Sequence, residues 1–170
     1  MKPIVFDNEM TTHNIVSLME SIHDSISKEK IILYFSGHGI NISGEKMLIN
    51  FINNLDLNNV QIEIIAFNHL FESAFNVFFK CCPQKSILKT VIGMIRLPQD
   101  PAALKEIRVE NRFLYDVAKK DNETFLKWIS PVNFTEREAR KIKSGKQLML
   151  DNNRLMTILH GYYNILSEPV

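Results

Sequence analysis

Two short segments of the sequence carry side chains that could bind an anion or move a proton. Residues 36–39 read Ser-Gly-His-Gly and directly follow the apolar run 31–35. A short run of β-branched and aromatic residues predicts a buried strand, and Gly-x-Gly after it allows a sharp turn that exposes backbone N–H groups. Such turns build anion and oxyanion pockets. The first segment therefore predicts a pocket at the end of this strand.

The second segment places a histidine and a serine between a predicted strand and a predicted helix. His69 follows the strand expected at 60–67, and Ser73 lies at or just inside the start of the helix expected at 70–80. The N–H groups and the dipole of a helix start favour a developing negative charge, which makes Ser73 a candidate nucleophile. His69 and His38 are candidate bases, because both lie at strand ends. A serine at a helix start also serves as an N-cap, so both interpretations stay open.

The elements that position these residues alternate along the chain. Apolar and β-rich runs predict strands at 3–6, 31–35, 60–67, 87–97 and 148–150. Apolar residues at helical spacing predict a helix that Thr11 or Thr12 could cap, and further helices from residue 44 and at 70–80, 102–120 and 154–166. Thr135, with Glu138 three residues on, predicts a capping box that opens another helix, 135–145. Strands that alternate with helices favour a parallel α/β sheet, whose sites lie at the carboxyl ends of the strands.

Size and composition fit one soluble domain over residues 1–170. Hydrophobic residues make up 45% of the 170 residues and charged residues 23%, which is the balance of a globular protein. The formal net charge of +1 gives no reason to expect nucleic acid or an anionic membrane as a partner. Without a signal-peptide core or a long apolar stretch, the expected location is the cytoplasm.

The sequence predicts neither a metal site nor a cofactor. The adjacent Cys81 and Cys82 suit neither an ordinary disulfide nor the separated ligand pairs of a zinc site, so we expect reduced thiols. The chain has no Gly-Lys-Ser/Thr phosphate loop and no His/Cys cluster at ligand spacing. Chemistry at this site would depend on the protein side chains alone.

In order and spacing these motifs resemble the proteolytic subunit of the Clp protease, within the Clp/crotonase superfamily. In that family an apolar strand leads into Ser-Pro-Gly-Gly with a further glycine five residues on, and here residues 36–39 and Gly44 occupy those places. The resemblance implies stacked βαβ units that form a mostly parallel sheet flanked by helices. It also implies that Ser73 stands at the position of the nucleophile, and that Gly39 and Ala74 supply the oxyanion N–H groups.

Two catalytic positions of the family differ in this chain. The family histidine lies in a strand that reads Met-Ile-His-x-Pro, whereas residues 94–98 read Met-Ile-Arg-Leu-Pro, which puts Arg96 at the position of the base. A guanidinium presents only donors and cannot accept a proton at neutral pH. The family aspartate precedes a helix that residues 134–139 match, but Pro-Val-Asn at 131–133 provides no carboxylate. The resemblance thus predicts a degenerate catalytic triad.

The function implied by this pattern is a catalytically impaired serine-peptidase homologue. By resemblance it would form a homo-oligomer, a ring or a trimer, and would bind peptide or unfolded protein or serve as a structural subunit, with a Clp-type ATPase as a further candidate partner. One alternative is an active serine peptidase in which Ser73 uses His69 or His38 as a non-standard base. Another is a caspase-like cysteine peptidase centred on His38, since residues 34–39 also resemble the histidine turn of that family. The caspase family needs a cysteine at the end of the next strand, where this chain has Asn68 and His69.

Overall fold

The computed structural model describes residues 3–26, 30–81, 84–129 and 134–166, without the side chains of residues 109–110 and 162–166. The chain divides into two compact units, Met1–Gly93 (unit 1) and Met94–Val170 (unit 2). None of the described helices is long and apolar enough to cross a membrane.

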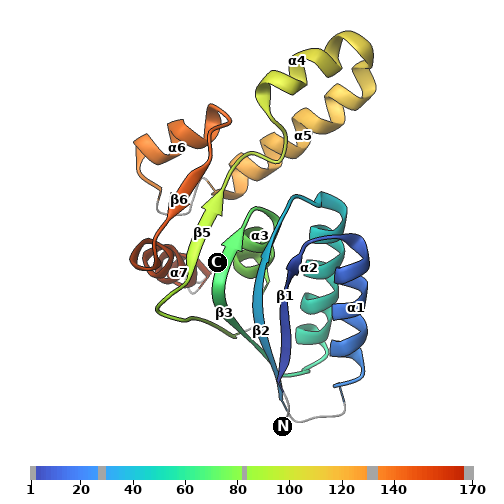
Figure 1. Cartoon of the computed structure of the whole chain (residues 1–170), viewed down its shortest axis with the longest axis vertical. Helices are drawn as coiled ribbons and strands as arrows, with labels where there is room; N and C mark the ends of the chain where they lie inside the picture. The colour runs from blue at the N-terminus through green and yellow to red at the C-terminus, as the bar shows by residue number, and fades with distance from the viewer. Residues whose placement is uncertain (1–2, 27–29, 82–83, 130–133, 167–170) are drawn as a thin grey trace. The chain divides into compact units, whose positions relative to one another are not determined.

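Unit 1 is a parallel sheet with helices packed against it (Figure 1). Its strands are β1 (Ile4–Glu9), β2 (Ile31–His38), β3 (Ile62–Phe71) and β4 (Gln84–Ile87). Its helices are α1 (Thr12–His23), α2 (Ile42–Leu57) and α3 (Ser73–Lys80). β2 lies between β1 and β3, β4 pairs with β3, and all these pairings are parallel. The predicted parallel α/β class is therefore confirmed.

The core of unit 1 forms where one face of the sheet meets these helices. β1 and β2 pair so that Phe6 lies opposite Phe35, and the two rings stack with centroids 5.4 Å apart. Burial alternates from Ile31 to Phe35 of β2, as expected for a strand with one covered face. The helices bury apolar side chains against this face: Ile15 and Ile22 from α1, Leu48 and Ile52 from α2, and Phe75, Phe78 and Phe79 from α3.

Several predicted boundaries in unit 1 are wrong. β2 continues through His38, because β1 extends to Glu9 and pairs with residues that were expected to form the turn. β3 continues to Phe71, so α3 begins at Ser73 and not at residue 70. The predicted N-cap Thr11 is confirmed, since its side chain accepts a hydrogen bond of 3.2 Å from the N–H of Asn14.

Unit 2 is mainly helical. After β5 (Ile92–Ile95), the strand in which the boundary between the units falls, come α4 (Pro101–Glu110), α5 (Arg112–Ile129), α6 (Glu136–Lys143), β6 (Leu148–Leu150) and α7 (Asn152–Leu166). The sheet order places β6 beside β5. The β-rich segment 87–97 thus holds the end of one strand and a second strand. The single helix expected at 102–120 is also wrong, because Asn111 has extended backbone (φ −152°, ψ 102°) and separates α4 from α5.

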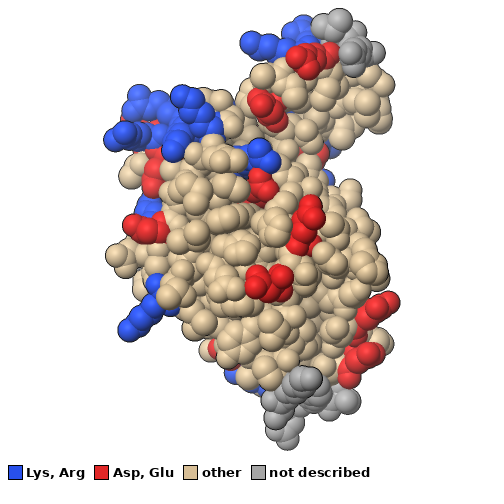
Figure 2. Space-filling view, in the orientation of Figure 1, with Lys and Arg blue, Asp and Glu red and all other residues tan. Residues whose placement is uncertain are grey.

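Basic side chains gather on α6 and the turn after it. Figure 2 shows Lys and Arg concentrated where Figure 1 places α6. The exposed cations of this segment are Arg137, Arg140, Lys141, Lys143 and Lys146. Cations in the last turn of a helix interact favourably with its dipole, so part of this concentration stabilises α6 itself.

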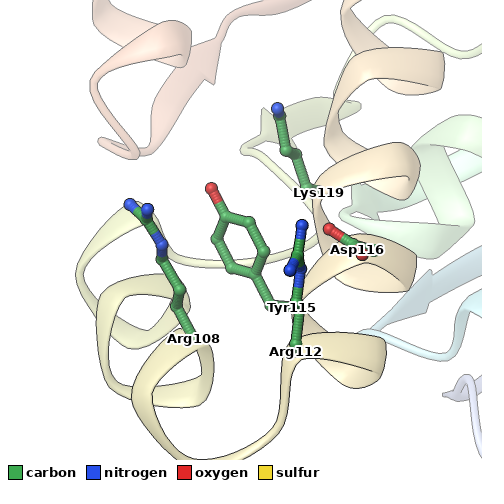
Figure 3. A pocket seen from close by; sticks show the side chains of 5 residues that line it. All are labelled: Arg108, Arg112, Tyr115, Asp116 and Lys119. Atoms are coloured by element: carbon green, nitrogen blue, oxygen red, sulfur yellow. The ribbon is translucent and has the colours of Figure 1, made fainter.

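The antiparallel pair α4 and α5 forms a polar pocket on one side. Arg108 comes from α4, and Arg112, Tyr115, Asp116 and Lys119 come from α5 (Figure 3). The pocket has a volume of about 540 Å³. The four α5 residues lie at positions i, i+3, i+4 and i+7, so they share one face of that helix.

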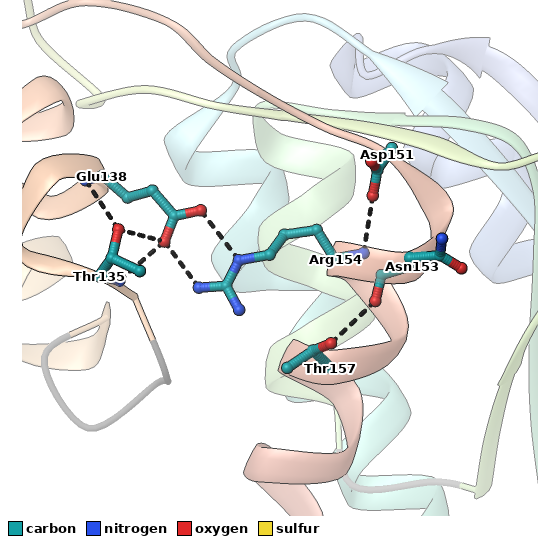
Figure 4. A network of polar contacts seen from close by, with 6 residues as sticks. All are labelled: Thr135, Glu138, Asp151, Asn153, Arg154 and Thr157. Atoms are coloured by element: carbon teal, nitrogen blue, oxygen red, sulfur yellow. Dashed lines mark hydrogen bonds and ion pairs between the residues drawn. The ribbon is translucent and has the colours of Figure 1, made fainter.

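A polar network joins α6 to α7. The predicted capping box at Thr135 and Glu138 is confirmed, with Glu138 N–H donating to the hydroxyl of Thr135 and Thr135 N–H donating to the Glu138 carboxylate. The same carboxylate accepts hydrogen bonds from Nε and Nη2 of Arg154 at 2.9 and 2.7 Å (Figure 4). These contacts lower the pKa of Glu138, chiefly through the hydrogen bond from Arg154.

Candidate active site

The Ser-Gly-His-Gly segment forms the end of β2 and the first residue beyond it. Gly37 pairs with Asn8 of β1, and a Cβ at Gly37 would lie 3.0 Å from the carbonyl oxygen of Asn8 and 3.2 Å from Cβ of Ala74. A side chain there would push the start of α3 away from the sheet. Gly39 follows with φ of +92°, a conformation that favours glycine, so the turn begins at this residue.

A bulge in β3 positions His69 beside β2. Phe35 pairs with Ala66, but Gly37 pairs with Leu70, so β3 has two more residues than β2 between these pairs. The hydroxyl of Ser36, which is fully buried, satisfies the backbone of this bulge. It donates a hydrogen bond to the carbonyl oxygen of His69 at 3.1 Å and accepts one from the N–H of His69 at 3.4 Å. Ser36 therefore shapes the strand end rather than facing a substrate.

The carboxyl ends of β1, β2 and β3 bring together a small polar cluster. The rings of His38 and His69 lie with centroids 5.7 Å apart, and His69 also contacts the ring of Phe71 at 4.8 Å. Asn68 donates a hydrogen bond of 3.0 Å to the carboxylate of Asp7. The pKa of His69 is lowered mainly by burial and further by His38, while Asp7 acts in the opposite direction. The lowered pKa favours the neutral imidazole at pH 7, the state that a general base requires.

Ser73 is a buried residue whose hydroxyl contacts the polypeptide backbone. The residue is 2% exposed, and Oγ accepts a hydrogen bond of 2.9 Å from the N–H of Asn41. The N–H of Ser73 donates to the carbonyl oxygen of Gly39 at 3.3 Å. Both bonds join the glycine turn to the first residue of α3. In the part of the chain that the structure describes, His69 is hydrogen-bonded to Ser36 and its ring lies near that of His38, and no hydrogen bond joins either histidine to the hydroxyl of Ser73.

The sharpest backbone feature of the site is Glu72, directly before Ser73. Its φ of 56° and ψ of −114° mark a conformation that side chains with a Cβ rarely adopt. The other described non-glycine residues with positive φ are Asn59 and Asn68, and asparagine tolerates this region better than glutamate. The chain thus makes a strained turn from β3 into α3. The sequence gives no sign of this strain, because glutamate is unremarkable before a helix.

A buried network that the sequence did not predict holds α3 against α2. Glu45 is 6% exposed, and its carboxylate accepts hydrogen bonds from Asn76 at 2.9 Å and from Lys80 at 2.8 Å. A carboxylate in this position would cost several kcal/mol without such partners. Asn76 and Lys80 are one turn apart on α3, which fixes the rotation of the helix that begins at Ser73.

The structure brings the predicted oxyanion residues close to the predicted nucleophile. Gly39 is hydrogen-bonded to Ser73 through the backbone, and Ala74 is the next residue of α3, close to Gly37. Arg96 follows β5 directly and is half-buried in unit 2.

The remaining site predictions concern the absent aspartate, the cysteines and metal ions. Residues 131–133 and Cys82 lie outside the described residues. Cys81 is fully buried just after the last residue of α3, where it is shielded from any substrate. Within the described part of the chain, no group of three or more His, Cys, Asp or Glu side chains is arranged to hold a metal ion.

Comparison with known proteins gives one kind of match. No family model matches the chain, and no curated protein matches its sequence. Among solved structures, the chain is similar to a mutant of ClpP1 from Listeria monocytogenes, with a TM-score of 0.63 and 12% sequence identity over 92% of this chain and 87% of that one. At this identity the similarity establishes the fold and nothing about chemistry. The chain therefore has a mixed α/β fold like that of ClpP.

Proposed function

We propose that this chain is a Clp-protease-like serine-peptidase homologue with an impaired catalytic site, which acts as an oligomeric peptide-binding or protein-binding subunit or as a structural one. The observation that carries the proposal is the state of Ser73. A nucleophile must reach the substrate and lose its proton to a base, but Ser73 is 2% exposed and its hydroxyl already accepts a hydrogen bond from the backbone of Asn41. A structural role accounts for both facts.

The groups that would have to activate Ser73 support the same conclusion. Arg96 stands at the position where the resemblance places the base, and a guanidinium presents only hydrogen-bond donors and cannot accept a proton at neutral pH. Burial lowers the pKa of His69, which favours its neutral form. Its backbone is bonded to the hydroxyl of Ser36, its ring Nδ1 lies 3.4 Å from the same hydroxyl, and the ring packs against Phe71 and His38. Without a base in contact, a serine hydroxyl is too weak a nucleophile to attack a peptide bond.

The strained turn at Glu72 supports the proposal from a different direction. Backbone strain persists where the surrounding structure enforces it, and such sites cluster at functional positions. In many hydrolases the nucleophile occupies a strained turn from a strand into a helix, which exposes its side chain at the end of the sheet. Here the residue with that backbone is Glu72 (φ 56°, ψ −114°), and Ser73 is the next one. A carboxylate at the turn and a buried serine after it fit a site that has lost its nucleophile.

An oligomeric role is supported by an exposed apolar surface on α5. Phe113, Leu114 and Val117 are 73%, 53% and 46% exposed, and they lie within about one turn of each other. Adjacent large apolar side chains of this kind mark interaction sites. We propose that they contribute to contacts within a ring or trimer, that the 170 residues act as one cytoplasmic domain, and that peptide, unfolded protein or a Clp-type ATPase are its candidate partners.

Peptide hydrolysis tests the impaired site. The wild-type protein and Ser73→Ala are incubated with a panel of fluorogenic peptides and with unfolded casein, and cleavage is compared with a blank without protein. We expect all three rates to agree within error. Cleavage by the wild type that Ser73→Ala abolishes would overturn the proposal and favour an active serine peptidase with His69 or His38 as its base.

Sedimentation velocity tests the oligomeric role. We expect the wild type to sediment as an oligomer and Leu114→Arg to shift it toward smaller species. Leu57→Arg is the matched control, because Leu57 is 79% exposed at the end of α2 and should leave the oligomer intact. A monomeric wild type would contradict this part of the proposal.

A further inference from the structure

The pocket between α4 and α5 is positively charged, although the chain as a whole is nearly neutral. The chain as a whole has a formal charge of +1, but this pocket is lined by three cations, Arg108, Arg112 and Lys119, and one carboxylate, Asp116. The side chains project into the same space from two helices (Figure 3). A pocket of about 540 Å³ is within the usual range of about 300–1,000 Å³ for small-ligand sites.

Its cations are available to a ligand. Neither Arg108 nor Arg112 takes part in a salt bridge recorded for the described residues. Lys119 lies 3.7 Å from Glu123, and both side chains are more than half exposed, so this pair contributes little. Asp116 is one helical turn from Arg112, the spacing at which opposite charges commonly pair, yet no ion pair joins them.

One of the cations is already held in place. The guanidinium of Arg108 lies over the ring of Tyr115, with Cζ 5.8 Å from the ring centroid. A cation at this distance interacts with the aromatic ring while the donors at the edge of the guanidinium stay free. Arg108 therefore loses little side-chain freedom when it binds an anion, and the Tyr115 hydroxyl adds a further donor beside it.

The spacing of the cations favours an elongated anion. The backbone positions of Arg112 and Lys119 are seven residues apart on α5, about 10 Å along the helix axis. A chain of linked phosphates can contact both cations with their side chains extended, whereas a single phosphate would require both side chains to bend toward one point. Guanidinium groups also match the geometry of phosphate oxygens, to which they donate paired hydrogen bonds.

We propose that the α4–α5 pocket binds a polyphosphate group, with Arg112 and Lys119 along the chain of phosphates and Arg108 at its side. The group has two sources, a free inorganic polyphosphate and the triphosphate of a nucleotide. Asp116 limits the affinity, because its carboxylate faces the same pocket. The inference is independent of Ser73 and of the impaired catalytic site.

Isothermal titration calorimetry with sodium tripolyphosphate at low ionic strength tests the proposal. We expect saturable binding of the wild type and at least a tenfold loss of affinity in Arg112→Gln and in Arg108→Gln. Lys127→Gln is the matched control, because it removes a cation from an exposed position of α5 outside the pocket, and it should change affinity less than twofold. Circular dichroism of each variant establishes that it is folded.

Two further titrations test the role of Asp116 and the source of the phosphate group. Asp116→Asn should tighten binding several-fold, whereas Glu106→Gln, which changes the charge equally at an exposed site on α4, should not. ATP that binds at least tenfold more tightly than tripolyphosphate would identify a nucleotide as the source, and equal affinity would identify the inorganic chain. Absence of binding, equal losses in Arg112→Gln and Lys127→Gln, or citrate binding as tightly as tripolyphosphate would overturn the proposal.

Discussion

Replacement of Glu72 by glycine should make the protein more stable than replacement by alanine. The backbone at this residue has φ 56° and ψ −114°, which glycine adopts without steric cost. Strained conformations of this kind cost about 1–3 kcal/mol for a residue with a Cβ. Against this, glycine loses about 0.4–1 kcal/mol relative to alanine, because its unfolded chain is more flexible. The balance favours Glu72→Gly over Glu72→Ala by about 1 kcal/mol.

The comparison of the two variants isolates the backbone. Both remove the glutamate side chain and any contact that it makes, so the difference between them reports the backbone strain minus the entropy cost of glycine in the unfolded chain. The control is Asn50, which is exposed in the middle of α2. At a regular helix position alanine is the better residue by about 1 kcal/mol, so Asn50→Gly should be less stable than Asn50→Ala.

Urea unfolding followed by circular dichroism measures both pairs. A difference of about 1 kcal/mol in a protein of this size corresponds to roughly 2–4 °C in Tm, which thermal unfolding resolves. We expect opposite signs at positions 72 and 50. If Ala is more stable than Gly at position 72 by about 0.4–1 kcal/mol, as at an unstrained position, the turn into α3 is unstrained and the argument that links Glu72 to a former nucleophile position fails.

Three further predictions concern side chains that the structure places in defined contacts. Ser73→Ala should lower the free energy of unfolding by about 1–2 kcal/mol in urea titrations, because the N–H of Asn41 loses its acceptor; an unchanged midpoint would mean that the hydroxyl is not structural. Glu138→Gln should cost about 1–2 kcal/mol at pH 7, because it weakens the paired bonds to Arg154. The pKa of Glu138 is lowered below its usual 4.5, chiefly by Arg154, so this stabilisation is present above pH 4.5 and is lost as the pH falls through the folded-state pKa. The free energies of unfolding of the wild type and Glu138→Gln should therefore converge at low pH. Burial lowers the pKa of His69 from its usual 6.5, so the unfolded state binds the proton more readily and the free energy of unfolding should fall as the pH drops below 6.5. His69→Gln should remove part of that fall. Identical pH profiles of stability for the wild type and His69→Gln would contradict the lowered pKa of His69.

The sequence predicted the fold well where local signals and tertiary packing agree. The capping box at Thr135 and Glu138 and the N-cap at Thr11 follow from residue types at fixed spacing, and both occur. The break between α4 and α5 was missed, because apolar spacing runs across Asn111. The side chain of Asn111 accepts a hydrogen bond from the N–H of Leu114 at 3.2 Å, so it caps α5, and asparagine at this position was the available signal.

The candidate site was less predictable, because it depends on strand pairing. The turn expected at residues 36–39 begins only at Gly39, since β1 extends through three polar residues and holds Ser36, Gly37 and His38 in the strand. No alternation of apolar residues reveals that extension. The bulge at residues 67–69 likewise follows from the pairing of Gly37 with Leu70, which no local pattern encodes. Long-range register decided which residues face the site.

Labelling by a fluorophosphonate tests most directly whether Ser73 retains nucleophilic chemistry. The reagent forms a covalent adduct with activated serine hydroxyls, and intact-mass spectrometry measures the modified fraction. The proposed impaired site predicts that wild-type protein and Ser73→Ala both remain unmodified, while Arg96→His gains no more than trace labelling because Ser73 is buried. A stoichiometric adduct on the wild type that is absent from Ser73→Ala would contradict the account.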